Sequence, residues 1–214
     1  MKKKTDDKPV RWGILATGNI AKQFARGLQV IPDARLVAVG SRTRKGAEAF
    51  AKEFNVPNVH ASYEALASDP DVDAVYVATP HPFHRENTIL CLNAGKAVLC
   101  EKPFAINARE AREMIACARQ NNVFLMEAMW TRYLPLYTKV RELLSNGVIG
   151  DVRMVKADFC FRADLKPEGR LFNLALGGGG LLDIGVYTIS FANMICGPKP
   201  ERMASLAHIG TTGV

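Results

Sequence analysis

Residues 11–21 read Arg-Trp-Gly-Ile-Leu-Ala-Thr-Gly-Asn-Ile-Ala and join an apolar segment to a helical one through a short turn. Residues 11–15 have the apolar character of a buried strand, and apolar side chains then recur at helical spacing at Ile20, Phe24 and Leu28. A strand that enters a helix through a turn containing glycine predicts the first part of a β-α-β unit.

The turn itself follows the pattern G-x-G-x-x-G/A, with Ala16, Gly18 and Ala21 at the small-residue positions. Gly18 allows a pyrophosphate to approach the backbone, and Ala21 allows the helix to pack close to the strand. Because Ala16 replaces the first glycine, the turn alone also fits any α/β protein. A strand precedes it and a helix and second strand follow, so we expect a dinucleotide to bind at this turn, including Asn19 and Ile20.

Strand-like and helix-like segments continue to alternate through the first 130 residues. Further strands are predicted at 35–39, 72–78, 97–100 and 123–127, and further helices at 45–54, 86–93 and 108–121. This alternation predicts the α/β class, with residues 1–130 forming a Rossmann domain around a doubly wound parallel sheet.

The pattern changes in residues 131–214. We expect helices at 136–146 and 181–195 and strands at 152–162 and 202–209, which describes an α+β domain with an open, mainly antiparallel sheet. Two strands are too few to cover the second helix, so we expect this domain to be incomplete and its C-terminal part to be missing.

Composition and charge exclude several classes of protein. Apolar residues make up 48% and charged residues 23% of the chain, as in soluble globular proteins. No run is expected to cross a membrane, and no apolar segment follows the basic N-terminus as in a secretory signal. The net charge of +7 forms no basic stripe with interleaved aromatics, so nucleic acid is not an expected partner. Five cysteines without CxxC spacing indicate reduced, mostly buried thiols in a cytoplasmic protein.

The second strand is followed by Ser41-Arg42-Thr43-Arg44-Lys45. An acidic residue about 20 residues after the fingerprint binds the ribose 2′-hydroxyl in enzymes that use NAD. Here a hydroxyl and basic side chains stand in its place, and they suit a 2′-phosphate. We therefore expect NADP rather than NAD as the cofactor, bound by Ser41, Arg42 and Lys45. Alternatively, Arg42 belongs to a solvated helix start.

Polar residues also follow the third and fourth long strands, at Thr79-Pro80-His81-Pro82-Phe83-His84 and at Glu101-Lys102-Pro103. Ligands bind at the carboxyl ends of parallel strands, so we expect a set of cofactor-binding residues here: Thr79, Pro80, His81, His84, Glu101 and Lys102. For the two histidines, capping is the alternative role. No metal site is expected, because Pro82 separates them and no third ligand is near.

Three side chains, Lys102, Asp183 and Tyr187, could carry proton-transfer chemistry. Lys102 could hold a substrate hydroxyl or transfer a proton, or it could simply pair with Glu101 at the surface. Asp183 and Tyr187 are four residues apart on the predicted helix and share a face. Together they could hydrogen-bond a polyol and relay a proton, although Tyr187 alone also fits a core tyrosine.

Taken together, these motifs resemble the glucose–fructose oxidoreductase / inositol dehydrogenase (Gfo/Idh/MocA) family over essentially the whole chain. The Glu-Lys-Pro tripeptide is the most specific of them. Residues 126–132, Met-Glu-Ala-Met-Trp-Thr-Arg, and residues 179–187, Gly-Gly-Leu-Leu-Asp-Ile-Gly-Val-Tyr, resemble the branch that contains dimeric dihydrodiol dehydrogenase and NADP-dependent D-xylose dehydrogenases.

The resemblance implies roles for individual residues. Lys102 would be the active-site lysine, Tyr187 the proton donor or acceptor, and Asp183 a group that orients the substrate. Arg162, at the end of the strand predicted at 152–162, would line the pocket. Hydride would pass between NADP and the CH–OH or carbonyl group of a sugar, polyol or trans-dihydrodiol.

The resemblance also implies an assembly, because full-length relatives continue through more strands and pair as homodimers through that sheet. The alternative for this chain is a truncated nucleotide-binding protein without turnover.

Overall fold

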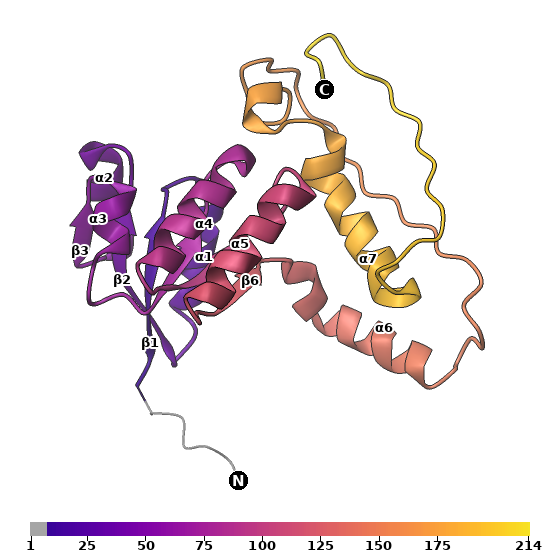
Figure 1. Cartoon of the computed structure of the whole chain (residues 1–214), viewed down its shortest axis with the longest axis horizontal. Coiled ribbons are helices and arrows are strands. Elements are labelled where there is room, and N and C mark those ends of the chain that lie inside the picture. Colours follow the sequence, from indigo (N-terminus) through magenta and orange to yellow (C-terminus); the bar gives the residue numbers. More distant parts are fainter. Residues whose placement is uncertain (1–7) are drawn as a thin grey trace. The chain divides into compact units, whose positions relative to one another are not determined.

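The computed structural model describes residues 8–214. The chain divides into two compact units, one ending at Ala128 and the other running from Met129 to Val214. They are coloured indigo to magenta and salmon to yellow in Figure 1.

The first unit contains a six-stranded parallel sheet with the order β3-β2-β1-β4-β5-β6. Its strands are β1 (Val10–Leu15), β2 (Ala34–Gly40), β3 (Asn58–His60), β4 (Ala74–Val77), β5 (Ala97–Cys100) and β6 (Leu125–Glu127). Its α-helices are α1 (Asn19–Leu28), α2 (Arg44–Phe54), α3 (Tyr63–Ala67), α4 (His84–Asn93) and α5 (Ala108–Gln120), and a 3-10 turn, η1 (His81–Phe83), precedes α4. This order is that of the Rossmann fold, so the predicted doubly wound α/β architecture is confirmed. The short elements β3 and α3 were not predicted.

Successive residues of the central strands face opposite sides of the sheet. Leu15 and Val75 belong to a core on one face, whereas Ile14, Val39 and Tyr76 belong to a core on the other. All four residues of β4 are buried, as expected for a parallel strand covered by helices on both faces. The near-continuous apolar run that predicts this strand is a direct consequence of that double burial.

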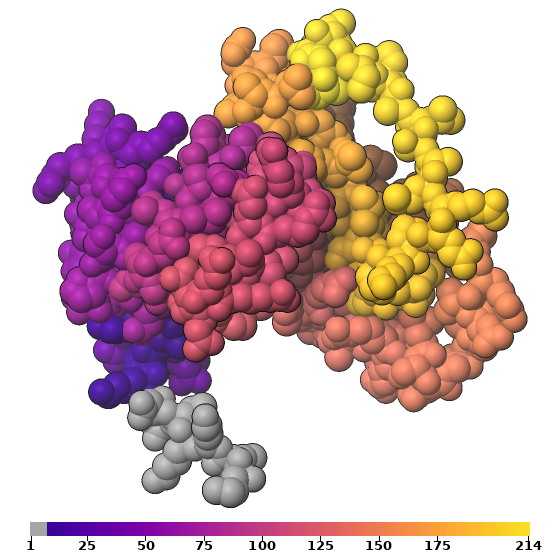
Figure 2. Space-filling model, in the orientation of Figure 1, coloured from indigo at the N-terminus to yellow at the C-terminus, as the bar shows by residue number. Residues whose placement is uncertain are grey.

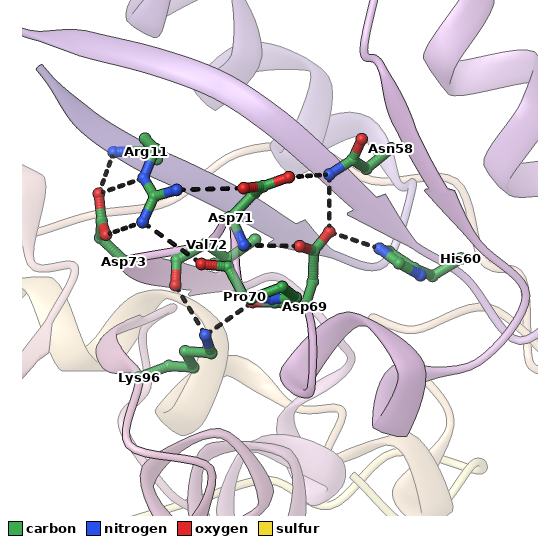
Figure 3. Close-up of polar contacts among 9 residues, drawn as sticks. All are labelled: Arg11, Asn58, His60, Asp69, Pro70, Asp71, Val72, Asp73 and Lys96. Carbon is green, nitrogen blue, oxygen red and sulfur yellow. Dashed lines mark hydrogen bonds and ion pairs between the residues drawn. The ribbon is translucent and has the colours of Figure 1, made fainter.

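The loop between α3 and β4 is fastened by a polar network near the amino ends of β1, β4 and β5 (Figure 3). The Arg11 guanidinium contacts both carboxylate oxygens of Asp73, at 3.1 and 2.8 Å. Lys96 Nζ donates to the carbonyl oxygens of Asp69 and Val72 at 2.7 and 2.8 Å. The buried Asp69 carboxylate also contacts His60 Nε2 at 2.8 Å. Ligands of this fold bind at the carboxyl ends of the strands, which is the opposite edge of the sheet. We therefore assign this network a role in stabilising the fold and not in binding a ligand.

The second unit contains helices and irregular chain. Its elements are the 3-10 turns η2 (Trp130–Tyr133) and η3 (Leu174–Leu176), α6 (Pro135–Ser145), the π-helical turn η4 (Leu181–Gly185) and α7 (Val186–Cys196). No strand occurs in residues 129–214, so the strands predicted at 152–162 and 202–209 and the antiparallel sheet are absent from the described chain. An extended segment becomes a strand only when a neighbour accepts its hydrogen bonds, and neither segment has one. Figure 2 shows part of the C-terminal segment, in yellow, as a single extended chain with no second segment packed beside it along that part.

Two further expectations need correction. The segment Leu174–Cys196, which contains η3, η4 and α7, is long and apolar enough to cross a membrane by length and composition, although no such run was predicted. The helix predicted at 181–195 is formed by η4 and α7, which together run from Leu181 to Cys196. Length and composition alone are weak evidence for a membrane span. Among the cysteines, Cys91, Cys100 and Cys117 are buried as expected, but Cys160 and Cys196 are exposed.

Candidate active site

The candidate site of the first unit lies at the carboxyl ends of β1, β2, β4 and β5. β1 pairs with β2 on one side and with β4 on the other, so the strand order reverses beside β1. In open α/β sheets, ligands bind in the crevice at such a reversal. The predicted motifs that follow these four strands therefore share one edge of the sheet.

The turn after β1 leaves room for a ligand over its backbone. Gly18 is the N-cap of α1, and a Cβ atom added there would meet no protein atom within 4 Å. Thr43, Ser62 and Asn107 cap α2, α3 and α5 with side-chain oxygens, whereas α1 has no side-chain cap and no acidic residue in its first turn. Uncapped amides at a helix N-terminus attract anions, so this turn fits the phosphates of a dinucleotide.

Ala16 has a φ of +85° and donates its N–H to the carbonyl oxygen of Gly40 at 2.9 Å. A positive φ is costly for a residue with a Cβ, which explains why the pattern prefers glycine at this position. The alanine therefore keeps the geometry of the fingerprint turn.

Ser41, Arg42 and Lys45 lie where β2 passes into α2. Ser41 is buried at the end of the strand, and Arg42 and Lys45 are exposed. Arg42 and Thr79 are among the residues that line a cavity of about 560 Å³, which Tyr63 also lines. Burial raises the pKa of the Tyr63 hydroxyl, and the adjacent Arg42 guanidinium opposes this shift. Tyr63 was missed, because it follows β3, a three-residue strand with no periodicity to reveal it.

His84 lies in the interior, with no exposed surface. Its Nδ1 is 2.8 Å from the carbonyl oxygen of Pro103, and its Nε2 is 2.8 Å from that of Thr79. Burial lowers the pKa of the imidazole. The two ring nitrogens thus contact the backbone of the loops after β4 and β5. This arrangement matches the alternative role, in which the histidine holds backbone groups and does not contact the cofactor. His81 is also buried, with its ring centroid 5.7 Å from that of His84.

The loop that carries Lys102 is held from several elements. The Lys102 N–H donates to Glu101 Oε2 at 3.0 Å, and the Phe104 N–H donates to Glu127 Oε1 at 3.0 Å. The Lys102–Pro103 peptide bond is cis. The Tyr76 hydroxyl donates to Glu101 Oε1, and burial raises the pKa of that carboxyl group. Lys102 itself is half-buried at the end of β5.

The second unit holds the remaining predicted residues. Asp183 is buried in the π-helical turn η4, and its Oδ1 accepts a hydrogen bond from Arg170 at 2.6 Å. Tyr187, in α7, accepts a hydrogen bond from Trp130 Nε1 at 3.1 Å and packs edge-on against Phe159. Arg162 is exposed in irregular chain, where a strand was predicted.

Two family models together cover most of the chain. One, described as "Oxidoreductase family, NAD-binding Rossmann fold", matches residues 10–129, and the GFO/IDH/MocA C-terminal domain matches residues 137–213. The chain belongs to the Gfo/Idh/MocA oxidoreductase family. The family resemblance predicted from the sequence is therefore confirmed.

The relatives of this chain include trans-1,2-dihydrobenzene-1,2-diol dehydrogenases. The mouse protein (Mus musculus) is 48% identical over 208 residues, and the human protein (Homo sapiens) is 43% identical. Each alignment covers 96% of this chain and 62% of the relative. The chain thus spans about three fifths of the length of these relatives.

Solved structures extend this comparison. A 3-ketoreductase from Actinomadura kijaniata, in complex with NADP and TDP-benzene, superposes with a TM-score of 0.78 at 34% identity, over 89% of this chain and 58% of that one. A scyllo-inositol dehydrogenase from Lactobacillus casei gives a TM-score of 0.64 at 27% identity, over 69% of this chain and 44% of that one. The Gfo/Idh/MocA fold of this chain is thus that of known oxidoreductases.

Proposed function

We propose that this chain belongs to an NADP-dependent oxidoreductase that acts on a CH–OH group or the corresponding carbonyl. One observation carries the proposal. The Rossmann unit leaves open space at Gly18, and it places a hydroxyl and a guanidinium, Ser41 and Arg42, where an NAD enzyme has an acid. The names of the relatives, which are dehydrogenases and a ketoreductase seen with NADP, support it.

The proposed cofactor contacts follow from position. Gly18 with Asn19 and Ile20 would receive the pyrophosphate at the α1 N-terminus, beside Ala16. Ser41, Arg42 and Lys45 would bind the 2′-phosphate, because hydroxyl and basic groups are matched to a dianion. A further group at the carboxyl ends of β4 and β5 would line the rest of the dinucleotide site: Thr79, Pro80, His81, Glu101 and Lys102. We propose that His84 supports the site through Thr79 and Pro103 rather than by direct contact.

The proposed chemistry uses two residues on the substrate oxygen. The cofactor would supply a hydride as NADPH or accept one as NADP+. Lys102 would donate a hydrogen bond to the substrate oxygen and stabilise its developing negative charge. Tyr187 would move the proton to or from that oxygen. Asp183, held by Arg170, would orient the substrate, and Arg162 would line its pocket.

We propose a trans-dihydrodiol, sugar or polyol as substrate, because the relatives are named for a ring diol, a keto group and an inositol. We also propose that residues 1–130 bind the nucleotide and residues 131–214 contribute to substrate binding and dimerisation. Exposed apolar side chains of the second part, such as Met203 at 86% and Ile189 at 49%, support association of two copies. A cytoplasmic location fits the buried reduced thiols of the first unit.

A second candidate function is nucleotide binding without turnover. The observation that favours it is the absence of any strand in residues 129–214, which leaves Arg162 and its neighbours exposed and irregular. Cofactor affinity and turnover therefore need separate measurements.

The test is a titration of the purified chain with NADPH and NADH, followed by fluorescence or calorimetry. Arg42→Ala should weaken NADPH binding by about ten- to a hundredfold, the value of a charge-assisted hydrogen bond, and leave NADH unchanged. Arg35→Ala is the matched control, because Arg35 lies on the same strand near its amino end. Equal affinity of Arg42→Ala and the parent chain for NADPH would refute the proposed 2′-phosphate contact.

Turnover is then measured with trans-dihydrodiols, xylose and glucose. Lys102→Met and Tyr187→Phe should each abolish most of the rate while NADPH affinity stays within about threefold, because neither residue is among the proposed phosphate contacts. Tight NADPH binding without turnover on any of these substrates would favour the second candidate.

A further inference from the structure

Tyr76 links two parts of the candidate site that are far apart in the sequence. It lies in β4 with only 2% of its surface exposed. Its ring stacks on Phe24 of α1, with centroids 3.9 Å apart and planes inclined by 17°. Its hydroxyl donates a hydrogen bond to Glu101 Oε1, at the end of β5. One side chain thus contacts both the fingerprint helix and the residue before Lys102.

Glu101 uses its two carboxylate oxygens in different directions. Oε1 accepts from Tyr76, and Oε2 accepts from the Lys102 N–H at 3.0 Å. The residue is only 7% exposed, and burial raises the pKa of its carboxyl group. The two hydrogen bonds and the Lys102 charge oppose that shift, whereas Glu127 on β6 adds to it. A buried carboxylate that loses a donor must take up a proton or find another partner.

We propose that Tyr76 is a positioning residue for Lys102. Its hydroxyl fixes the Glu101 carboxylate, and that carboxylate fixes the backbone N–H of Lys102. Its ring, stacked on Phe24, ties this arrangement to the helix that would receive the pyrophosphate. The inference rests on the proposed function of Lys102 for its catalytic meaning, but the geometry can be tested without turnover.

The first experiment replaces Tyr76 by phenylalanine, which keeps the ring on Phe24 and removes only the hydroxyl. Carbon-13 NMR of labelled glutamate, assigned with Glu101→Gln, should show the carboxyl pKa of Glu101 raised further by about one unit or more, which is tenfold in proton affinity. Amide exchange of Lys102 should accelerate by about tenfold, while NADPH affinity changes by less than about threefold. Tyr137→Phe is the matched control, because its ring packs edge-on against Phe191 in the second unit.

Turnover adds a readout that a packing defect would not reproduce. Tyr76→Phe should lower kcat with little change in KM for NADPH, and Glu101→Gln should have the same effect. The double variant should be no worse than either single one, because both remove the same link.

Several outcomes separate the possibilities. A folded Tyr76→Phe chain with unchanged Glu101 titration and unchanged Lys102 exchange overturns the proposal. If that variant does not fold, 3-fluorotyrosine at position 76 is used instead. Its more acidic hydroxyl should lower the Glu101 pKa, and an unchanged or raised pKa would equally overturn the inference. If Lys102→Met retains full turnover while Tyr76→Phe accelerates Lys102 exchange, the positioning role stands and the proposed catalytic role of Lys102 falls.

Discussion

The two units of this chain have similar proportions of apolar residues but differ in how those residues are packed. In the first unit, six parallel strands exchange hydrogen bonds and bury a core on each face, including Leu15 and Ile14 with no exposed surface. In the second unit, α7 contains no buried residue and no segment pairs as a strand. A helix satisfies its own backbone, whereas an extended segment needs a neighbour. Helices therefore form in both units, but a sheet forms only in the first.

Thiol reactivity should separate the two units by the largest factor. Burial raises the pKa of Cys91 and of Cys100 to about 12. At neutral pH their thiolate fraction is therefore about a thousandfold below that of an ordinary thiol. Cys160 and Cys196 are exposed.

Iodoacetamide labelling followed by mass spectrometry should modify Cys160 and Cys196 at least a thousand times faster than Cys91 and Cys100. Labelling in denaturant is the control, where all sites should react. Comparable rates in the native chain would show that the first unit opens readily, and the contrast between the units would be lost.

Truncation of one leucine in each unit should give the next largest difference. Leu15→Ala removes a side chain with no exposed surface and should lower the free energy of unfolding of the first unit by about 2–5 kcal/mol. Leu181→Ala makes the same chemical change at a side chain that is 70% exposed, and should cost about 0.5 kcal/mol or less. Urea unfolding followed by circular dichroism measures both. A loss above 2 kcal/mol for Leu181→Ala would mean that η4 has a packed face in solution.

Acid should act mainly on the first unit. Burial of Asp69 favours its neutral form, but the hydrogen bonds to its carboxylate prevail and its pKa lies below the usual value. Hydrogen bonds from Arg11 likewise lower the pKa of Asp73. A carboxyl with a lowered folded pKa stabilises the fold above its unfolded pKa of about 4, and this stability is lost as pH falls through the folded value. Unfolding free energy should therefore drop below about pH 4.

Asp69→Asn should remove part of that drop and cost about 1–3 kcal/mol at pH 7, because the bonds to His60 and Asn58 lose their charged acceptor. Asp33→Asn, an exposed substitution, is the control. The same acid profile for Asp69→Asn and the parent chain would show that the network in Figure 3 does not set the acid limit.

The ion pair of the second unit should give the smallest effect. Arg170→Met leaves the buried Asp183 carboxylate without this donor. Because the arginine side chain is 47% exposed, we expect the free energy of unfolding to fall by only about 1 kcal/mol. Faster amide exchange over residues 181–187 is the measurement. Arg153→Met is the control, because its pair with Asp151 is 84% and 82% exposed. Equal exchange in both variants would mean that the Arg170–Asp183 pair does not order η4.

The sequence was informative wherever a signal is local. The alternation of segments up to residue 130 predicted the sheet, because periodicity reflects burial of one face or both. The prediction of a strand at residues 152–162 was wrong, although these residues alternate as a strand does, because strand pairing depends on a partner elsewhere in the chain. It also missed β3 and α3, which are too short to show a period, and with them Tyr63 beside Arg42.

The sequence by itself therefore determined the contiguous motifs, whose residues are neighbours in the chain. These are the turn at Ala16 and Gly18, the pair Ser41-Arg42, and the tripeptide Glu101-Lys102-Pro103. Only the tertiary structure decided how these motifs are held, with His84 between the carbonyls of two loops and Tyr76 between Phe24 and Glu101. The physical reason is that a buried polar group needs a partner, and the fold supplies that partner from a distant part of the chain.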